Sequence, residues 1–99
     1  MPSVIHMATY VIETYLSRTR TGELDAATSR LRAAIAAVAA VPATGTTGVP
    51  VRHVRSFFVP EDEMCFHVVE APSIETAAEI GRRASLSPER IVEAEAAPG

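Results

Sequence analysis

The chain has 99 residues, which is the length of one ordinary domain. Apolar residues make up 47% of it, but 17 of them are alanines, which leaves 30 larger apolar side chains for the whole core. A formal net charge of −3 and the lack of a basic patch argue against nucleic-acid binding. A single cysteine rules out an intrachain disulfide, and no run approaches the ~18–20 apolar residues of a membrane span. We therefore expect a cytoplasmic protein with neither a nucleic-acid nor a membrane partner.

The first half of the chain predicts one strand followed by one helix. We expect a frayed leader over 1–7, in which Met7 is an alternative start, because these residues have no apolar period. Residues 8–16 are rich in β-branched and aromatic side chains, which favours a strand. A helix is predicted to open at Thr21 and to stop at Pro42, with leucine, isoleucine and alanine at helical spacing between them.

The second half predicts a hairpin, a second helix and a last strand. Glycine and threonine in 43–50 indicate a loop, and strands follow at 51–59 and 63–70 around a short turn. Ser73 is the predicted cap of the second helix, which ends in two arginines. A short strand is expected over 91–95, before a disordered end.

The predicted order is β-α-β-β-α-β, which is the ferredoxin-like arrangement of the α+β class. We expect one domain over 1–99, ordered from about residue 8 to residue 95, with tails at both ends. Its antiparallel sheet would have four strands in the order 4-1-3-2, with both helices on one face.

The alternation of side chains along the strands then predicts which residues the helices cover. The covered face is expected to hold Tyr10, Ile12, Leu16, Val54, Ser56, Phe58, Met64, Phe66 and Val68. The opposite face is expected to hold Val11, Glu13, Tyr15, Val51, His53, Arg55, Phe57, Val59, Cys65, His67 and Val69. The second set is half apolar, and no element is left to cover it. A contiguous apolar patch of several hundred Å² usually marks an interface, so we expect a homodimer, joined either face to face or along a strand edge.

The uncovered face also collects the polar groups most suited to chemistry. If the hairpin is centred on Glu61, then Arg55 lies opposite His67, and Glu13 of the neighbouring first strand approaches the same histidine. The predicted ligand-binding residues on this face are Glu13, Tyr15, His53, Arg55, Phe57, Cys65 and His67. No catalytic residue is predicted.

Several interpretations of this cluster remain open. An Arg55–Glu13 ion pair beside His67 would serve only to fix the register of the dimer. Alternatively, the cluster holds a small molecule, or His67 and Glu13 bind a divalent metal, which the fixed charge of Arg55 opposes. Cys65 and His67 leave one strand on the same face, so a cysteine–histidine nucleophile is a further reading.

One segment resembles a known family. The block VRHVRSFFVPEDEMCFHVVEAPS at 51–73, with YVIE at 10–13 and PERIVE at 88–93, resembles the bacterial domain-of-unknown-function 4242 family, also labelled nickel-binding-protein-like. The resemblance implies a ferredoxin-like fold, a homodimer and binding of nickel or a similar divalent ion. Glu13 matches the family's strand-one glutamate, whereas Arg55 and His67 stand where many relatives have histidine and cysteine.

The sequence therefore predicts a small dimeric binding protein that holds a divalent metal or a small anionic ligand. One alternative is a dimeric ferredoxin-like enzyme, of the monooxygenase or isomerase type, that acts on an apolar small molecule; this rests on fold analogy. Another is a purely structural dimer. The expected cofactor is nickel or another divalent metal, or else none.

Overall fold

The computed structural model describes residues 7–39 and 50–95. Their elements follow the predicted order: β1 (Ala8–Tyr15), α1 (Glu23–Ala39), β2 (Arg52–Val59), β3 (Met64–Ala71), α2 (Ile74–Arg83) and β4 (Arg90–Ala94). The predicted leader before Met7, most of the glycine-containing loop, the approach to Pro42 and the last four residues lie outside the described ranges. Within those ranges, no helix has both the length and the hydropathy needed to cross a membrane.

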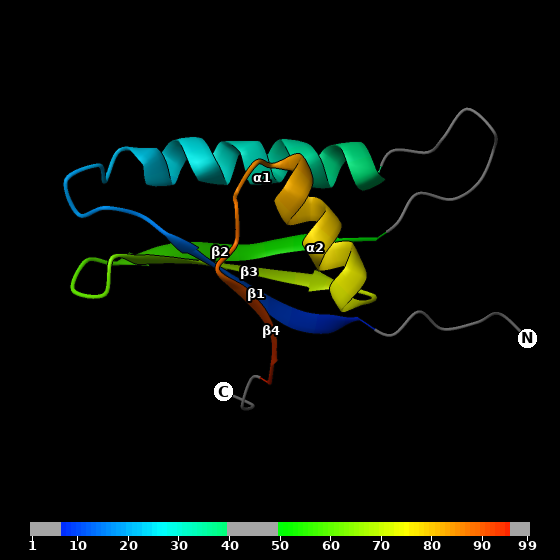
Figure 1. Ribbon diagram of the computed structural model, residues 1–99. Helices are drawn as coiled ribbons and strands as arrows, with labels where there is room; N and C mark the ends of the chain where they lie inside the picture. Colours follow the sequence, from blue (N-terminus) through cyan, green and yellow to red (C-terminus); the bar gives the residue numbers. More distant parts are fainter. Residues whose placement is uncertain (1–6, 40–49, 96–99) are drawn as a thin grey trace, which may run out of the picture.

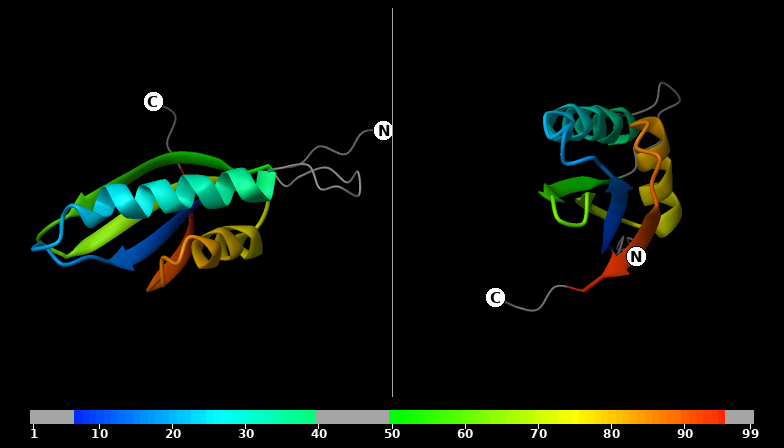
Figure 2. Two further views of the ribbon diagram at one scale, coloured as in Figure 1. Left: turned by 90° about the horizontal axis from the view of Figure 1, so that it is seen from above. Right: turned by 60° about the vertical axis from the view of Figure 1, so that its left-hand side comes forward.

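The four strands form one antiparallel sheet in the order β2-β3-β1-β4, which is the predicted order read from the other edge. Both helices lie on the same side of this sheet (Figures 1 and 2). α1 packs over β2, and α2 packs over β1, β3 and β4. The arrangement confirms an α+β fold with one covered sheet face and one face without helices.

The core lies between the helices and the covered face of the sheet. Its fully buried side chains include Ile12 and Val69 from the sheet, Leu31 from α1 and Ile80 from α2. The small Ala34 and Ala77 are also buried there, which lets the helices approach the sheet closely. The apolar spacing predicted for the first helix is therefore confirmed at Leu31 and Ala34. Ile74 at the start of α2 lies outside the core, because 42% of it is exposed.

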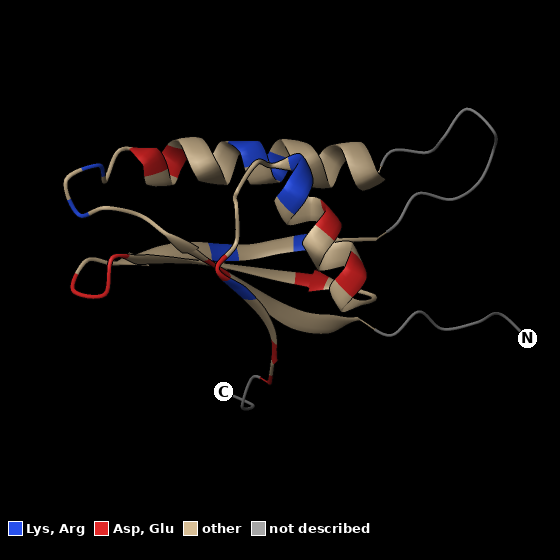
Figure 3. Ribbon diagram, in the orientation of Figure 1, with Lys and Arg blue, Asp and Glu red and all other residues tan. Residues whose placement is uncertain are grey.

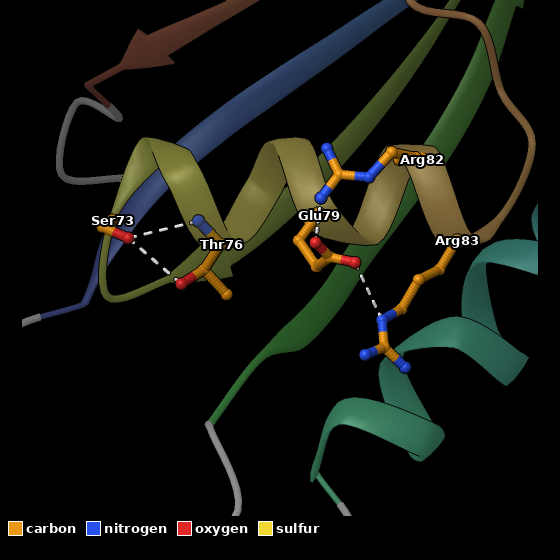
Figure 4. Close-up of polar contacts among 5 residues, drawn as sticks. All are labelled: Ser73, Thr76, Glu79, Arg82 and Arg83. Carbon is orange, nitrogen blue, oxygen red and sulfur yellow. Dashed lines mark hydrogen bonds and ion pairs between the residues drawn. The ribbon is translucent and has the colours of Figure 1, made fainter.

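Helix α2 has the ends that its sequence predicts (Figure 4). The Ser73 hydroxyl accepts a hydrogen bond from the backbone N–H of Thr76 at 3.2 Å, which satisfies one of the free amides of the first turn. In the last turns, Arg82 and Arg83 both form ion pairs with Glu79. These arginines also lie at the negative end of the helix dipole, where a positive charge is favourable.

The predicted facing of β3 is wrong, and the turn before it is the reason. The turn between β2 and β3 is acidic (Figure 3) and also includes Glu63, which has a left-handed backbone with φ of 52°. Phe58 consequently pairs with Cys65, and Ser56 pairs with His67. A shift of one residue moves every side chain of a strand to the opposite face. Cys65, His67 and Val69 therefore face the helices, whereas Met64, Phe66 and Val68 lie on the helix-free face.

A bulge in β2 changes the facing of that strand as well. The register shifts between His53 and Arg55, which leaves Val54 as the extra residue. His53 pairs with Val69, as predicted, but this places it on the covered side and not on the helix-free side. Val54, predicted to lie under the helices, is 39% exposed instead. Arg55 and Phe57 keep their predicted side.

Candidate functional site

The helix-free side of the sheet is largely apolar, and we call it the open face. Strand pairing places eight apolar side chains on it: Val11, Tyr15, Phe57, Val59, Met64, Phe66, Val68 and Val92. Tyr15 is 59% exposed and Phe57 is 43% exposed. The rings of Phe57 and Phe66 stack with centroids 5.2 Å apart, so the edge strand β2 and its neighbour β3 share an aromatic surface.

The charged groups on the open face are mostly paired within the chain. Glu13 accepts hydrogen bonds from the Nε and Nη2 atoms of Arg90 at 3.1 and 3.0 Å, because the two residues are partners across β1 and β4. The predicted ion pair between Glu13 and Arg55 is therefore wrong. Arg52 and Glu70, which are paired across β2 and β3, form a second ion pair at 2.6 Å. Arg55 has no ion pair among the described residues.

On the covered side, three polar side chains form a hydrogen-bonded chain that runs from the core outward. His67 is fully buried, and its Nδ1 lies 2.6 Å from the hydroxyl oxygen of Ser56. The same oxygen lies 2.9 Å from Nε2 of His53, which is half-buried. The Nε2 atom of His67 is buried and has no partner among the described residues. We call these three residues the His–Ser–His chain.

The His–Ser–His chain is neutral in the core. Burial, His53 and Arg30 together lower the pKa of His67 to about 4, so its imidazole carries no charge at neutral pH. Burial and the positive charge of Arg32 also lower the pKa of His53. Since Ser56 has a single proton to donate, it donates to one ring and accepts from the other. The chain can therefore hold one added proton without losing either hydrogen bond.

This geometry does not favour an activated nucleophile at Ser56. A serine nucleophile needs a base that can accept its proton, and a third group commonly orients and stabilises that base. Within the described part of the chain, neither imidazole is hydrogen-bonded to a carboxylate, and a proton on His67 would be buried without a counter-charge. Ser56 is better placed to connect the two rings than to attack a substrate.

Cys65 is also buried on the covered face, at the wall of a separate cavity. Burial raises the pKa of its thiol, which keeps it protonated and weakly nucleophilic at neutral pH. The cavity has a volume of about 280 Å³ and lies between α1 and the end of β1, with Thr14 and Arg30 in its lining. Cys65 and His67 share a face, as the cysteine–histidine reading requires, but burial outweighs the hydrogen bond with Thr14, which acts to lower the pKa of the thiol.

A groove runs between α1 and the edge strand β2, where the His–Ser–His chain reaches the surface. It has a volume of about 480 Å³. Its lining is polar apart from two aliphatic side chains, and it consists of Leu24, Asp25, Thr28, Ser29, Arg32, His53, Val54, Arg55 and Ser56. We call it the α1–β2 groove. One arginine, one carboxylate and one imidazole (Arg32, Asp25 and His53) therefore meet at one concave surface, and Arg55 borders it from a β2 position whose side chain leaves the sheet on the open face.

The structure divides the predicted ligand-binding residues between the two faces. Glu13, Tyr15, Arg55 and Phe57 project from the open face, whereas His53, Cys65 and His67 lie on the covered face. The predicted cluster is not brought together as a whole.

The two residues predicted to bind a metal ion do not fit such a site. His67 is the pairing partner of Ile12, and Glu13 is the partner of Phe66, so the imidazole and the carboxylate leave the sheet on opposite sides. Among the described residues, no group of three or more His, Cys, Asp or Glu side chains could hold an ion. His67 and Glu13 therefore do not form a metal site together.

Two residues of the site were not predicted from the sequence. Ser56 was assigned to the covered face as part of the core floor, and a hydroxyl among apolar neighbours there already needs a hydrogen-bond partner. That requirement was the available signal for the His–Ser–His chain. The role of Arg90 depends on the register between β1 and β4, for which the sequence holds no comparable signal.

Comparisons with known proteins support the fold and leave the function open. No protein-family model matches the chain, and no curated protein matches it. The structure resembles the crystal structure of SCO4226 from Streptomyces coelicolor A3(2), with a TM-score of 0.70 and 15% sequence identity. The match covers 92% of this chain and 100% of that chain. At this identity, the similarity shows a shared fold.

Proposed function

We propose that the protein is a homodimeric binding module of the ferredoxin-like type, in which two copies pack their open faces against each other. The observation that carries this proposal is the set of eight apolar side chains on a sheet face that no helix covers. Antiparallel sheets can leave one face in water, but that face then normally alternates to polar residues. On this open face, eight apolar side chains outnumber the charged ones, which are Glu13, Arg52, Arg55, Glu70 and Arg90.

The size of the apolar surface supports an interface. An aromatic side chain has about 150–250 Å² to bury, so the exposed parts of Tyr15 and Phe57 alone present on the order of 200 Å². The other six apolar side chains extend this surface over all four strands. Contiguous apolar patches above a few hundred Å² mark interaction sites on soluble proteins. A standard interface buries roughly 800 Å² on each partner, and each copy would contribute one such face to it.

The charges on the open face favour a second copy over a strongly charged partner. Glu13 is already neutralised by Arg90, and Glu70 is already neutralised by Arg52, so neither pair offers a free charge to a partner. A flat, apolar and internally neutral surface can pack against itself around a two-fold axis without bringing like charges together. Arg55 lies on the edge strand β2, where the rim of such a dimer would keep it in water.

A direct test is the sedimentation of the protein at micromolar concentration, before and after one charge is added to the open face. We expect wild-type protein to sediment as a dimer and Tyr15→Arg to sediment as a monomer, because a buried unpaired arginine is strongly unfavourable. Tyr15 lies at the end of β1 and is 59% exposed, so the folded monomer tolerates the substitution.

The matched control is Ile74→Arg, which adds the same charge at a residue of α2 that is 42% exposed and remote from the open face. It should leave the dimer unchanged. A wild-type monomer would overturn the proposal. Equal loss of the dimer in both variants would overturn it as well, because the interface would then not be specific to the open face.

A further inference from the structure

The α1–β2 groove has the side chains of an anion site. Arg32 lies close enough to His53 to affect its ionisation, and Arg55 lines the same groove. The lining also holds three hydroxyl groups. Thr28 donates to the Leu24 carbonyl and Ser56 is engaged by the two imidazoles, so Ser29 supplies the hydroxyl donor for an anion. Arginine binds phosphate and carboxylate groups through paired N–H donors, and hydroxyls add further donors. The groove opens on the helix side, so this inference is independent of the proposed dimer.

We propose that the α1–β2 groove binds a small oxyanion, a phosphate or a carboxylate group, between the guanidinium of Arg32 and the imidazole of His53. The one carboxylate in the lining, Asp25, precedes Arg32 by seven residues on α1. At 1.5 Å per residue this separates the two by about 10 Å along the helix axis. The groove therefore has room for an anion at Arg32 without direct contact to Asp25.

The His–Ser–His chain gives this site a way to take up a proton. Ser56 can accept a hydrogen bond from a protonated His53 while it donates its own O–H to Nδ1 of His67. The charged and titratable groups on the side of His53 are Asp25 and Arg32 from α1 and His67 on β3, and Arg55 borders the groove from β2. An anion between Arg32 and His53 offsets the repulsion that lowers the pKa of His53. Binding of an oxyanion whose own charge is constant, such as sulfate, should therefore tighten as the pH falls from 8 to 6.

The test is a titration of the protein with inorganic phosphate. Calorimetry measures the affinity, and the NMR signals of the imidazole rings report on the site. The chain has three histidines, and a His6→Ala variant leaves only His53 and His67 to assign. We expect the His53 signal to shift on saturation. A protonated His53 can only donate to Ser56, so Ser56 must donate its O–H to Nδ1 of His67. The proton of His67 should therefore lie on Nε2 in the complex, and imidazole ¹⁵N shifts identify this tautomer.

Three substitutions make the site specific. Arg32→Gln should weaken phosphate binding at least about tenfold, because it removes a charged hydrogen-bond partner. Asp25→Asn should tighten it about twofold, since a like charge roughly 10 Å away is lost. Arg83→Gln removes the same charge from α2, outside the groove lining, and should change the affinity less than twofold.

The inference is overturned if phosphate leaves the His53 signal unchanged, or if Arg83→Gln weakens binding as much as Arg32→Gln. The second result would mean a general attraction to arginine on the surface. Because Asp25→Asn is expected to act in the opposite direction, a variant that only damages the fold cannot imitate the full pattern.

Discussion

The two faces of the sheet differ in what they carry and in what covers them. The covered face holds most of the apolar core, yet its centre also contains His67, a fully buried imidazole. The open face has no helix over it, yet eight apolar side chains project from it, including the stacked rings of Phe57 and Phe66. The hydrogen-bonded polar chain thus lies on the covered face, and the large exposed apolar surface lies on the open face.

The difference shows that polarity alone does not identify the buried side of this sheet. On the covered face, Ser56 supplies a hydrogen bond to His67 and so limits the cost of burying the ring. On the open face, Glu13 and Arg90 neutralise each other. The apolar side chains around this pair are then available to contact a partner. We infer that the covered face stabilises the protomer and that the open face stabilises the assembly.

The largest effect should separate these two roles. Ile80→Ala truncates a fully buried side chain of α2 and should lower the free energy of unfolding by about 3 kcal/mol at every protein concentration. Val92→Ala, on the open face, should cost stability that becomes smaller on dilution, because the part of this side chain that is still exposed in the protomer is covered only in the proposed dimer. Urea unfolding at several concentrations measures both. A concentration-independent cost for Val92→Ala would contradict the separation.

A second effect of similar size should appear on acidification. An unfolded imidazole has a pKa of about 6.5, whereas that of His67 in the folded protein is about 4, so only the unfolded chain is protonated between these values. The stability that depends on His67 is complete above pH 6.5, and about 3 kcal/mol of it is lost as the pH falls to 4.

His67→Leu lacks this titration, so its stability relative to wild type should rise over the same pH window. Urea unfolding of both proteins between pH 7 and pH 4 gives the difference directly and cancels most of the contribution of the carboxylates. A difference that stays constant across the window would mean that His67 is not buried as the neutral form.

The smallest effect concerns α2, one of the two helices on the covered face. Ser73→Ala removes the cap of α2 and should cost about 1 kcal/mol, whereas Ser73→Asp keeps an acceptor at the cap and should cost less. The loss should be the same in dimer and monomer, since the cap is remote from the open face. Equal stability of the alanine and aspartate variants would contradict the role of the hydroxyl.

Much of the fold could be predicted from the sequence because local signals coincide with the strand order. The cap at Ser73, the stripe through Leu31 and the alternating pattern of β1 all identify their elements correctly. The facing of β3 could not, because it depends on a single residue. Whether Glu63 belongs to the turn or to the strand decides which sheet face every following residue of β3 occupies. Left-handed backbone usually coincides with glycine, and here the residue is a glutamate, so the sequence does not signal it.

The sequence identified some residues of the candidate site correctly, but it did not predict how they are arranged. His67 and His53 were singled out, and both belong to the His–Ser–His chain, but the bulge at Val54 and the longer turn move them to the covered side. Glu13 then meets Arg90 and not the histidine. Long-range pairing depends on register, and the pattern within one strand does not encode register.

The most direct test of the central claim, that the open face is covered by a second copy, is an isotope-filtered NOE experiment on a mixture of labelled and unlabelled protein. The account predicts intermolecular NOEs among the rings of Tyr15, Phe57 and Phe66, and none to the outer surface of α1. Intermolecular NOEs that map to α1 or α2, or a dimer with no ring contacts at the open face, would contradict it.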